Sequence, residues 1–195
     1  DERVVAEMMS HISPTSAVVR QKRPVLALLA VSCGIALVVI IGGFIGGLRI
    51  NTTPSEPLGL WRVAPLEHPI QVGEMVFVCP PETDAVSEGF ERGYLRSGLC
   101  PGGFGPLIKT VAAVGGKRIE IAGNVTIDGR PIANSSLVSQ DGQGRPLRPY
   151  AGGTIPAGFL FLHSPFPGSW DSRYFGPVPG SGVLGLAEQV LTYAP

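Results

Sequence analysis

The sequence lacks an excess of charge of either sign and holds few of the residues that bind metals. Its 195 residues include 15 Lys and Arg and 15 Asp and Glu, which gives a formal net charge of +0. A nucleic-acid-binding domain usually carries a basic face, so this composition gives no support for such a partner. Cysteine and histidine occur three times each, with no zinc-ligand spacing and no H-E-x-x-H motif. We therefore expect no nucleic-acid partner, no metal site and no cofactor.

Glycine and proline, in contrast, are abundant. The 27 Gly and 19 Pro are high counts for a helical protein and are more typical of a loop-rich β structure. Short runs rich in Val, Ile and Phe predict strands, and Asp128-Gly129 predicts a hairpin turn. The strands are expected within residues 73–79, 117–123, 124–132, 158–164 and 183–195. Only residues 81–98 have helical character and 135–158 resemble a loop, so the predicted fold class is a mostly antiparallel β domain.

One apolar run is long enough to cross a membrane. Residues 24–48 carry no charge, and a helix rising about 1.5 Å per residue over this length crosses a hydrocarbon core of about 30 Å. A secretory signal peptide has a shorter apolar region, about 7–15 residues, so we expect an uncleaved anchor; the Gly-rich end leaves cleavage as the alternative. Basic residues flank the run unequally: Arg20, Lys22 and Arg23 before it, Arg49 after it. The positive-inside rule then predicts a cytoplasmic tail, 1–23, and an exported domain, 49–195.

The three cysteines divide between the anchor and the exported domain. Cys33 lies within the apolar run and is expected to be a small membrane-facing residue. Cys79 and Cys100 lie in the exported part, where oxidising conditions favour a disulfide. A catalytic thiol would need a nearby histidine, and neither cysteine has one in the sequence. We therefore predict a Cys79–Cys100 bridge that closes a small helical insertion and adds about 3 kcal/mol to the free energy of unfolding.

Histidine, the usual base for a serine nucleophile, gives only weak signals. His11 lies in the predicted cytoplasmic tail, on the wrong side of the membrane for an exported site. His68 has the context of an exposed loop, and His163, which ends an apolar run, is more typical of a strand end than of a base. A Ser-His-Asp triad would need one of these two, and the sequence does not indicate it.

Lysine replaces histidine as a base where burial disfavours its ammonium form. Lowering a lysine pKa from ~10.4 to ~8 requires ~3.3 kcal/mol of differential destabilisation. Of the three lysines, Lys22 precedes the anchor and Lys117 follows a Gly-Gly turn. Lys109 alone lies in an apolar, strand-like run, beside Leu107 and Ile108. The local sequence leaves open the alternative that Lys109 lies on an edge strand and extends its ammonium group to solvent.

Three segments resemble, in order, those of bacterial type I signal peptidases, and more closely those of their TraF-type conjugative-transfer branch. The segments are TTPSEPLGLW at 52–61, PLIKTVAAVGG at 106–116 and SWDSRYFGPVP at 169–179. The S-x-P-x-G form of the first segment and the RGYL..G.CPGG pattern before the second are typical of that branch. Together with the anchor, the resemblance covers most of the chain. It implies a signal-peptidase-like antiparallel β domain attached to one N-terminal transmembrane helix.

The resemblance implies an active site, residue by residue. Ser55 matches the nucleophile of the family, and Lys109 matches its general base. Thr53 matches a hydroxyl residue that binds the oxyanion together with the backbone N–H of Ser55. For Glu56, which lies between Ser55 and Pro57, we expect a solvent-facing side chain.

Three residues of the last segment match supporting positions. Ser169 matches a serine that orients the lysine, and Asp171 and Arg173 match an ion pair that braces the site. A capped turn with a surface salt bridge is the alternative for these three. The sequence departs from the family at 115–117, Gly-Gly-Lys for the usual Pro-Gly-Asp, and at 163–165, His-Ser-Pro for the usual Gly-Asp-Asn. These departures leave open how the lysine is supported and oriented.

The resemblance implies a membrane-anchored serine peptidase with a Ser/Lys dyad, in the bacterial inner membrane with its catalytic domain in the periplasm. Its partners would be the membrane and an exported, pilin-like precursor. Water resolves the acyl-enzyme of this family, or, in some systems, the amino terminus of the pilin does so and gives a cyclic product. Two other functions stay open: a non-enzymatic assembly or scaffold protein of a secretion or conjugation apparatus, and a signal peptidase of the general secretory pathway. The oligomeric state is not indicated.

Overall fold

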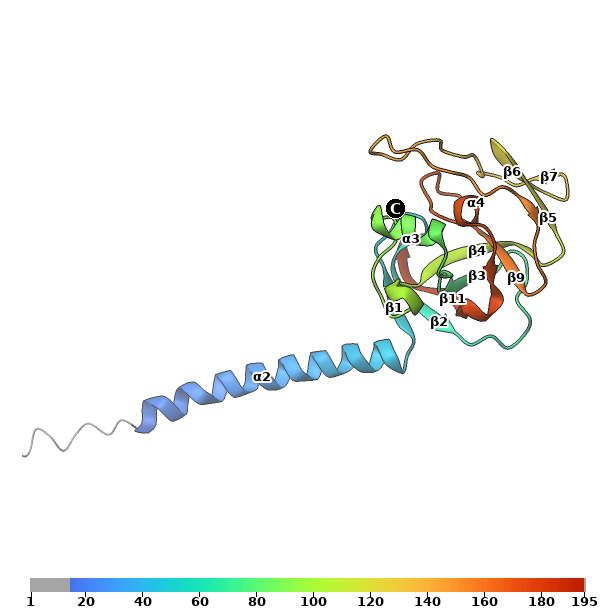
Figure 1. Ribbon diagram of the computed structural model, residues 1–195. Coiled ribbons are helices and arrows are strands. Elements are labelled where there is room, and N and C mark those ends of the chain that lie inside the picture. The colour runs from blue at the N-terminus through green and yellow to red at the C-terminus, as the bar shows by residue number, and fades with distance from the viewer. Residues whose placement is uncertain (1–14, 195) are drawn as a thin grey trace, which may run out of the picture. The chain divides into compact units, whose positions relative to one another are not determined.

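The computed structural model describes residues 15–194 and divides into two compact units, one up to Gly46 and one from Gly47 onward. Within the described residues, the first unit consists of one helix and the second holds the strands (Figure 1). Most of the predicted cytoplasmic tail, including His11, lies outside the described residues.

The helix of the first unit, α2, covers Thr15–Phe44. Its part Pro24–Phe44 has a mean hydropathy of 2.9 and is long and apolar enough to cross a membrane, although a signal sequence would share both properties. Cys33 is exposed on it with a free thiol. The helix ends four residues before the predicted end of the apolar run, since Gly47 adopts φ +64° and Leu48 already belongs to the first strand.

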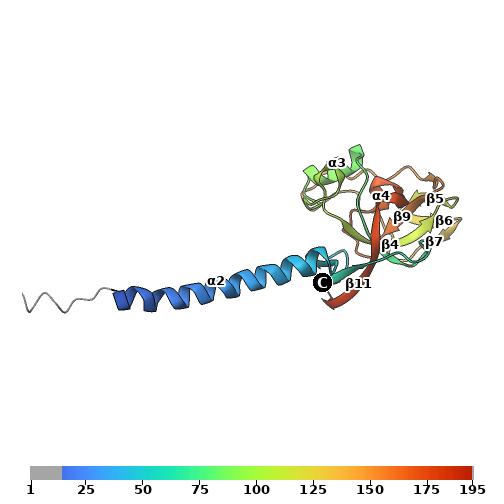
Figure 2. The same cartoon turned by 90° about the horizontal axis from the view of Figure 1, so that it is seen from below.

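The β domain contains a seven-stranded sheet and a four-stranded sheet, and every pair of hydrogen-bonded neighbours in both is antiparallel. The larger sheet has the order β1-β2-β11-β3-β4-β9-β10 and the smaller one β7-β6-β5-β8. The larger sheet consists of β1 (Leu48–Asn51), β2 (Leu58–Ala64), β3 (Met75–Val78), β4 (Leu107–Val114), β9 (Phe159–His163), β10 (Val178–Pro179) and β11 (Val183–Tyr193). The smaller sheet consists of β5 (Arg118–Ala122), β6 (Asn124–Ile127), β7 (Arg130–Pro131) and β8 (Gly153–Thr154). It lies at the opposite end of the domain from β1 and β2 (Figures 1 and 2).

The mostly antiparallel fold predicted from the sequence is confirmed. Each of the five expected strand segments contains a strand, and Asp128-Gly129 forms the hairpin turn between β6 and β7, with both residues at positive φ. Strands β1 and β2 were not expected from their sequences. They matter most for the site, because the serine segment is the loop that joins them.

The main core fills one face of the larger sheet beneath two short helices, α3 (Asp84–Glu91) and α4 (Ser172–Phe175). Trp170 belongs to this core, stacked on Tyr174 at 4.8 Å and tilted against Tyr94 at 5.1 Å between ring centroids. A Cβ on Gly89 of α3 would lie 2.4 Å from the indole nitrogen of Trp170, so this close approach requires glycine. The aromatic packing thus joins the helical insertion to the C-terminal segment that carries Asp171.

The predicted disulfide between Cys79 and Cys100 is confirmed, with 5.4 Å between the two Cα atoms. It joins the end of β3 to the short helix η1 (Pro101–Gly103) and closes the insertion that contains α3. We predict that Cys79→Ser lowers the free energy of unfolding by about 3 kcal/mol, because the unfolded chain gains the freedom of an open loop. Chemical denaturation measures this, with Cys33→Ser as the control for loss of a thiol alone. Equal stability of the two variants would contradict the prediction.

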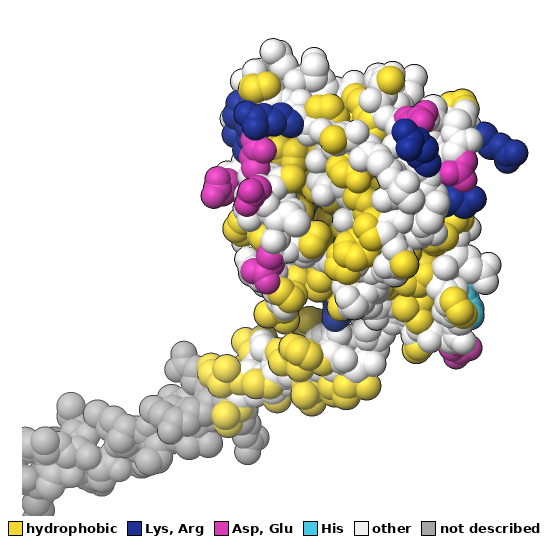
Figure 3. Space-filling model, turned by 45° about the vertical axis from the view of Figure 1, so that its right-hand side comes forward, with side chains coloured by type: hydrophobic (Ala, Val, Ile, Leu, Met, Phe, Trp, Pro, Cys, Tyr) yellow, Lys and Arg dark blue, Asp and Glu magenta, His cyan; other side chains and the backbone are white. Residues whose placement is uncertain are grey.

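On the face of the β domain shown in Figure 3, hydrophobic side chains gather along the middle and charged side chains lie mainly at the two sides.

The last strands are connected by short helical turns. The helix α4 lies between β9 and β10, and the 3₁₀ helix η2 (Gly180–Gly182) lies between β10 and β11. The functional residues indicated by the sequence come from the loop after β1, from β4, and from the segment that leads into α4 and its first turn.

Candidate active site

The side chain of Asn51 shapes the loop that carries Ser55. Its Nδ2 donates to the backbone oxygens of Thr53, Glu56 and Pro57 at 2.9–3.0 Å, while its Oδ1 accepts from the backbone N–H of Thr53 at 3.1 Å. A single asparagine side chain therefore makes four hydrogen bonds to the backbone of a tight loop. Asn51 is a site residue that the sequence reasoning missed, although an asparagine before a proline-containing turn is a recognisable signal.

Lys109 lies on β4 in the interior of the larger sheet, between β3 and β9. The alternative of an edge-strand lysine reaching solvent is therefore wrong. Strand alternation gives Lys109 the same face as Val111, which belongs to the main core, and only 3% of Lys109 is exposed. Its Nζ donates a hydrogen bond of 3.1 Å to Oγ of Ser55.

Burial determines the charge of this lysine. Loss of solvent lowers the pKa of Lys109 from its ordinary value, because the ammonium form is the one that water stabilises. The negative charges of Asp171 and Glu56 oppose this shift, and the positive charge of Arg173 adds to it. The result is an amine with a reduced affinity for protons beside a serine hydroxyl.

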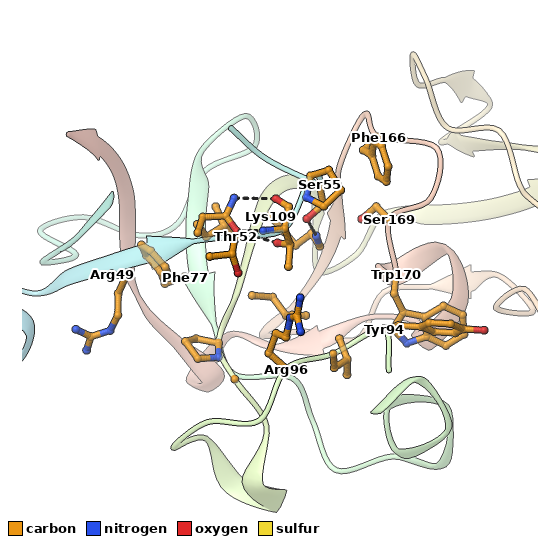
Figure 4. Close-up of a pocket in the computed structure, with 18 of the residues that line it drawn as sticks. Arg49, Thr52, Ser55, Phe77, Tyr94, Arg96, Lys109, Phe166, Ser169 and Trp170 are labelled. Atoms are coloured by element: carbon orange, nitrogen blue, oxygen red, sulfur yellow. Dashed lines mark hydrogen bonds between the residues drawn. The ribbon is translucent and has the colours of Figure 1, made fainter. Parts of the chain in front are cut away.

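Ser55 and Lys109 open into a pocket of about 500 Å³ (Figure 4). Side chains on several separate segments line it, among them Phe77 of β3, Leu95 of the disulfide-closed insertion, and Ser169 before α4. Most of these neighbours are apolar or uncharged. The pocket is large enough for several residues of an extended peptide, which the size of known ligand sites supports.

Asp171 and Arg173 form an ion pair inside the domain. Arg173 donates from Nε to Oδ1 of Asp171 at 2.8 Å and from Nη2 to Oδ2 at 2.9 Å, and both residues are fully buried. The alternative of a surface salt bridge is therefore wrong. Oδ2 of Asp171 also accepts from the backbone N–H of Ser164 at 3.1 Å, and the hydroxyl of Ser164 donates to the backbone oxygen of Ser55. The pair is thus connected through Ser164 to the serine loop.

Two other residues matched to the family have different surroundings. The hydroxyl of Thr53 donates to Oδ1 of Asn51 at 2.8 Å and so points at the side chain that shapes the loop. Ser169 lines the pocket and is 3% exposed, and its Oγ has no hydrogen-bond partner among residues 15–194. The amine of Lys109 donates to Ser55 and forms no hydrogen bond with Ser169. The role of Ser169 in orienting the lysine therefore stays a prediction.

Glu56 does not face solvent, and the expectation that it does is wrong. The loop shaped by Asn51 turns residue 56 inward, and only 5% of Glu56 is exposed. Burial raises the pKa of its carboxyl to about 7, against the opposing effects of Lys109 and of a hydrogen bond with Ser164. A carboxylate between Ser55 and Pro57 gave no sequence signal of burial.

The two histidines of the β domain lie as their sequences predicted. His68 is exposed, and His163 ends β9, where its Nε2 lies 3.2 Å from the backbone oxygen of Asn134. Burial lowers the pKa of His163. Where the family usually has an acid, Lys117 donates to Asp128 at 2.8 Å at the surface. Within residues 15–194, no group of three His, Cys, Asp or Glu side chains is placed to hold a metal ion.

The sequence matches the model of the signal peptidases, peptidase S26, over residues 22–192. The chain belongs to this family. Among its relatives in sequence, a "Probable conjugal transfer protein TraF" of Sinorhizobium fredii is 55% identical over 90% of this chain and 94% of its own length. A "Conjugal transfer protein TraF" of Agrobacterium fabrum is 55% identical over 89% of this chain and 99% of its own. A solved signal peptidase I of Enterococcus faecalis is 16% identical, covers 61% of this chain and 97% of its own, and aligns with a TM-score of 0.38.

Proposed function

We propose that this peptidase is a membrane-anchored serine endopeptidase in which Ser55 and Lys109 form the catalytic dyad. The observation that carries the proposal is the 3.1 Å hydrogen bond between a buried lysine amine and a serine hydroxyl at the wall of a pocket. A serine hydroxyl is a weak nucleophile until a neighbouring base accepts its proton. A lysine with a lowered pKa is such a base.

In the acylation step, the unprotonated amine of Lys109 accepts the proton of Ser55 as Oγ attacks the carbonyl carbon of the scissile peptide bond. The carbonyl oxygen becomes an oxyanion, which the backbone N–H of Ser55 and the hydroxyl of Thr53 would stabilise. The ammonium of Lys109 then gives its proton to the leaving amine as the C–N bond breaks. An ester between Ser55 and the substrate remains.

The ester is resolved by a second nucleophile. Lys109 accepts a proton from water as the water oxygen attacks the ester carbonyl. The ester C–O bond then breaks, the ammonium of Lys109 returns the proton to Oγ of Ser55, and the carboxylic acid of the product ionises in solvent. If the amino terminus of the same substrate attacks instead, the product is a cyclic peptide chain. The two products differ in mass by one water, so mass spectrometry distinguishes them.

The substrate we propose is an exported, pilin-like precursor of a conjugation apparatus, processed at the periplasmic face of the bacterial inner membrane. The names of the two TraF relatives support conjugation, and the S-x-P-x-G form of residues 55–59 agrees with that branch. The apolar helix and the basic residues before it support the orientation. A general signal peptidase would instead accept many unrelated exported precursors.

The experiment is to incubate the full chain in detergent micelles with candidate precursors and to read the products by mass. We expect one discrete product from pilin-like precursors and none with Ser55→Ala. Equal cleavage of unrelated secretory precursors would favour the general pathway. An intact precursor with the folded wild-type protein in every case would favour a scaffold function.

Thr53→Val tests the oxyanion assignment. Valine keeps the shape of threonine but removes the donor, and losing one oxyanion donor typically lowers kcat by about 10²–10³-fold. Since Thr53 now donates to Asn51, its hydroxyl must rotate toward the substrate for this role. Thr52→Val, an exposed neighbour in the same loop, is the control and should keep its rate. Equal rates for both variants would rule out the role for Thr53.

A further inference from the structure

Glu56 is a buried carboxyl that the acyl-transfer steps above do not use. It directly follows the serine nucleophile in the chain and is 5% exposed. Its Oε1 has no hydrogen-bond partner among residues 15–194. A buried polar atom without a partner lowers stability, so its presence beside Lys109 and Ser55 calls for an account of what it does there.

We propose that Glu56 is a positioning residue that sets the protonation state of Lys109, and thereby the pH range in which the lysine acts as a base. This inference rests on the proposed function and deepens it. Glu56 itself contacts no reacting atom in the proposed steps, and its effect passes through the charge of the amine.

The charges around the lysine decide which group controls it. Those that face Lys109 and its neighbourhood come from three segments: Glu56 from the serine loop, Asp171 and Arg173 at the start of α4, and His163 at the end of β9. Asp171 raises the pKa of Lys109 more than Glu56 does, but its carboxylate is held in a fully buried ion pair with Arg173 through two direct hydrogen bonds. Among residues 15–194, the carboxyl of Glu56 forms no ion pair, and the group that hydrogen-bonds to it is the neutral hydroxyl of Ser164. The ionisation of Glu56 therefore changes the net charge beside Lys109, whereas the Asp171–Arg173 pair stays balanced.

The position of Glu56 beside Lys109 determines in which direction its ionisation changes the pKa of the lysine. With the pKa of Glu56 raised to about 7, its carboxyl is neutral below that pH and leaves the lysine in an apolar surrounding that favours the free amine. Above that pH, the carboxylate stabilises the ammonium of Lys109 and raises the pKa of the lysine. Glu56 thus limits how far burial lowers the proton affinity of Lys109. A neutral residue at 56 removes this limit.

The test is a direct titration of the lysine in the full chain in detergent micelles. The chain has only three lysines, so ¹³C-lysine labelling gives few NMR signals, and that of Lys109 is assigned with Lys109→Met. In Glu56→Gln, which keeps the shape of the side chain, the midpoint of Lys109 should fall by about one pH unit. The exposed Lys117 should keep its midpoint in the same sample. Glu67→Gln, which removes an exposed carboxylate, is the matched control and should leave the midpoints of both lysines unchanged.

The reciprocal measurement needs no change at residue 56. If the two groups are coupled, removing the amine in Lys109→Met must raise the midpoint of the Glu56 carboxyl, followed with ¹³C-glutamate labelling. An unchanged Lys109 midpoint in folded Glu56→Gln, or an unchanged Glu56 midpoint in Lys109→Met, would overturn the proposal. If Glu56→Gln loses its near-ultraviolet circular dichroism, the reciprocal measurement alone decides.

Activity gives the functional readout. The lower pH limb of kcat/KM should move to lower pH in Glu56→Gln by the same amount as the Lys109 midpoint, because the rate follows the free amine. A structural defect would lower the rate at all pH values without moving the limb. If the midpoints shift while no precursor is cleaved, the proposed peptidase function fails and the coupling stands. If cleavage requires Ser55 and Lys109 but the limb and midpoints do not move, the inference about Glu56 fails alone.

Discussion

Lys109→Met is expected to lower kcat/KM for precursor cleavage by at least about 10⁴-fold, at the upper end of what a general base contributes. The loss is large because base and nucleophile act as a unit: without the amine, the hydroxyl of Ser55 keeps its proton. Lys109 is 3% exposed on an interior strand, so an unbranched apolar residue of similar length fits its place and the fold should persist. Mass spectrometry of the cleavage products measures the loss of activity, and circular dichroism on the same samples measures whether the fold persists.

Two further variants sharpen this result. Ser55→Ala should be as inactive as Lys109→Met, and the double variant should be no worse than either. Lys109→Arg should not restore activity, because a guanidinium stays protonated and accepts no proton at neutral pH. A folded Lys109→Met protein that processes a precursor at the normal rate would refute the dyad.

Asp171→Asn is expected to lower the free energy of unfolding by roughly 3–5 kcal/mol, the usual effect of removing one member of a buried ion pair. Both side chains of the pair are fully buried, so the guanidinium of Arg173 would keep a charge with no counter-charge and no water. Its remaining bonds go to backbone oxygens, among them that of Ser136 at 2.9 Å. Those dipoles compensate a charge less well than a carboxylate does. Chemical denaturation measures the change.

The matched control is the pair between Arg62 and Glu188, whose side chains are 54% and 45% exposed. Glu188→Gln should lower the free energy of unfolding by no more than about 1 kcal/mol, because water screens an exposed pair. Similar losses for the two variants would mean that the buried pair does not brace the site. A loss of activity in Asp171→Asn that exceeds its loss of fold would indicate that Ser164 and the serine loop have moved.

Much of this site could be predicted from the sequence, since its chemistry lies in short segments. Ser55 lies in a stiff, proline-flanked turn, and Lys109 is the one lysine in an apolar run. These two residues meet although 54 positions separate them. The apolar pattern around Lys109 left both a buried and an edge-strand lysine open, and only the strand order, with β4 between β3 and β9, excludes the edge-strand alternative.

The residues that support the serine loop could not be predicted in the same way. Ser164 contacts the backbone of Ser55 across 109 positions, and neither residue carries a local sign of the contact. Glu56 was misplaced for a similar reason: a carboxylate normally favours solvent, and only the loop closed by Asn51 turns it inward. Charge and polarity describe a residue's preference, whereas the tertiary contacts of the loop decide its position.

The disulfide makes the rigidity of the pocket wall depend on the redox conditions around the protein. The pocket wall formed by Tyr94, Leu95 and Arg96 belongs to the segment between Cys79 and Cys100. In a reduced chain that wall is held by non-covalent contacts, among them the hydrogen bonds from the backbone N–H of Tyr94 to Gly89 and from that of Gly105 to Arg96, and an oxidising compartment favours the covalent bond. If the β domain is exported as we propose, the covalent closure of this wall follows export. A thiol-reducing cytoplasm would then delay the rigid form of the pocket until the chain had left it.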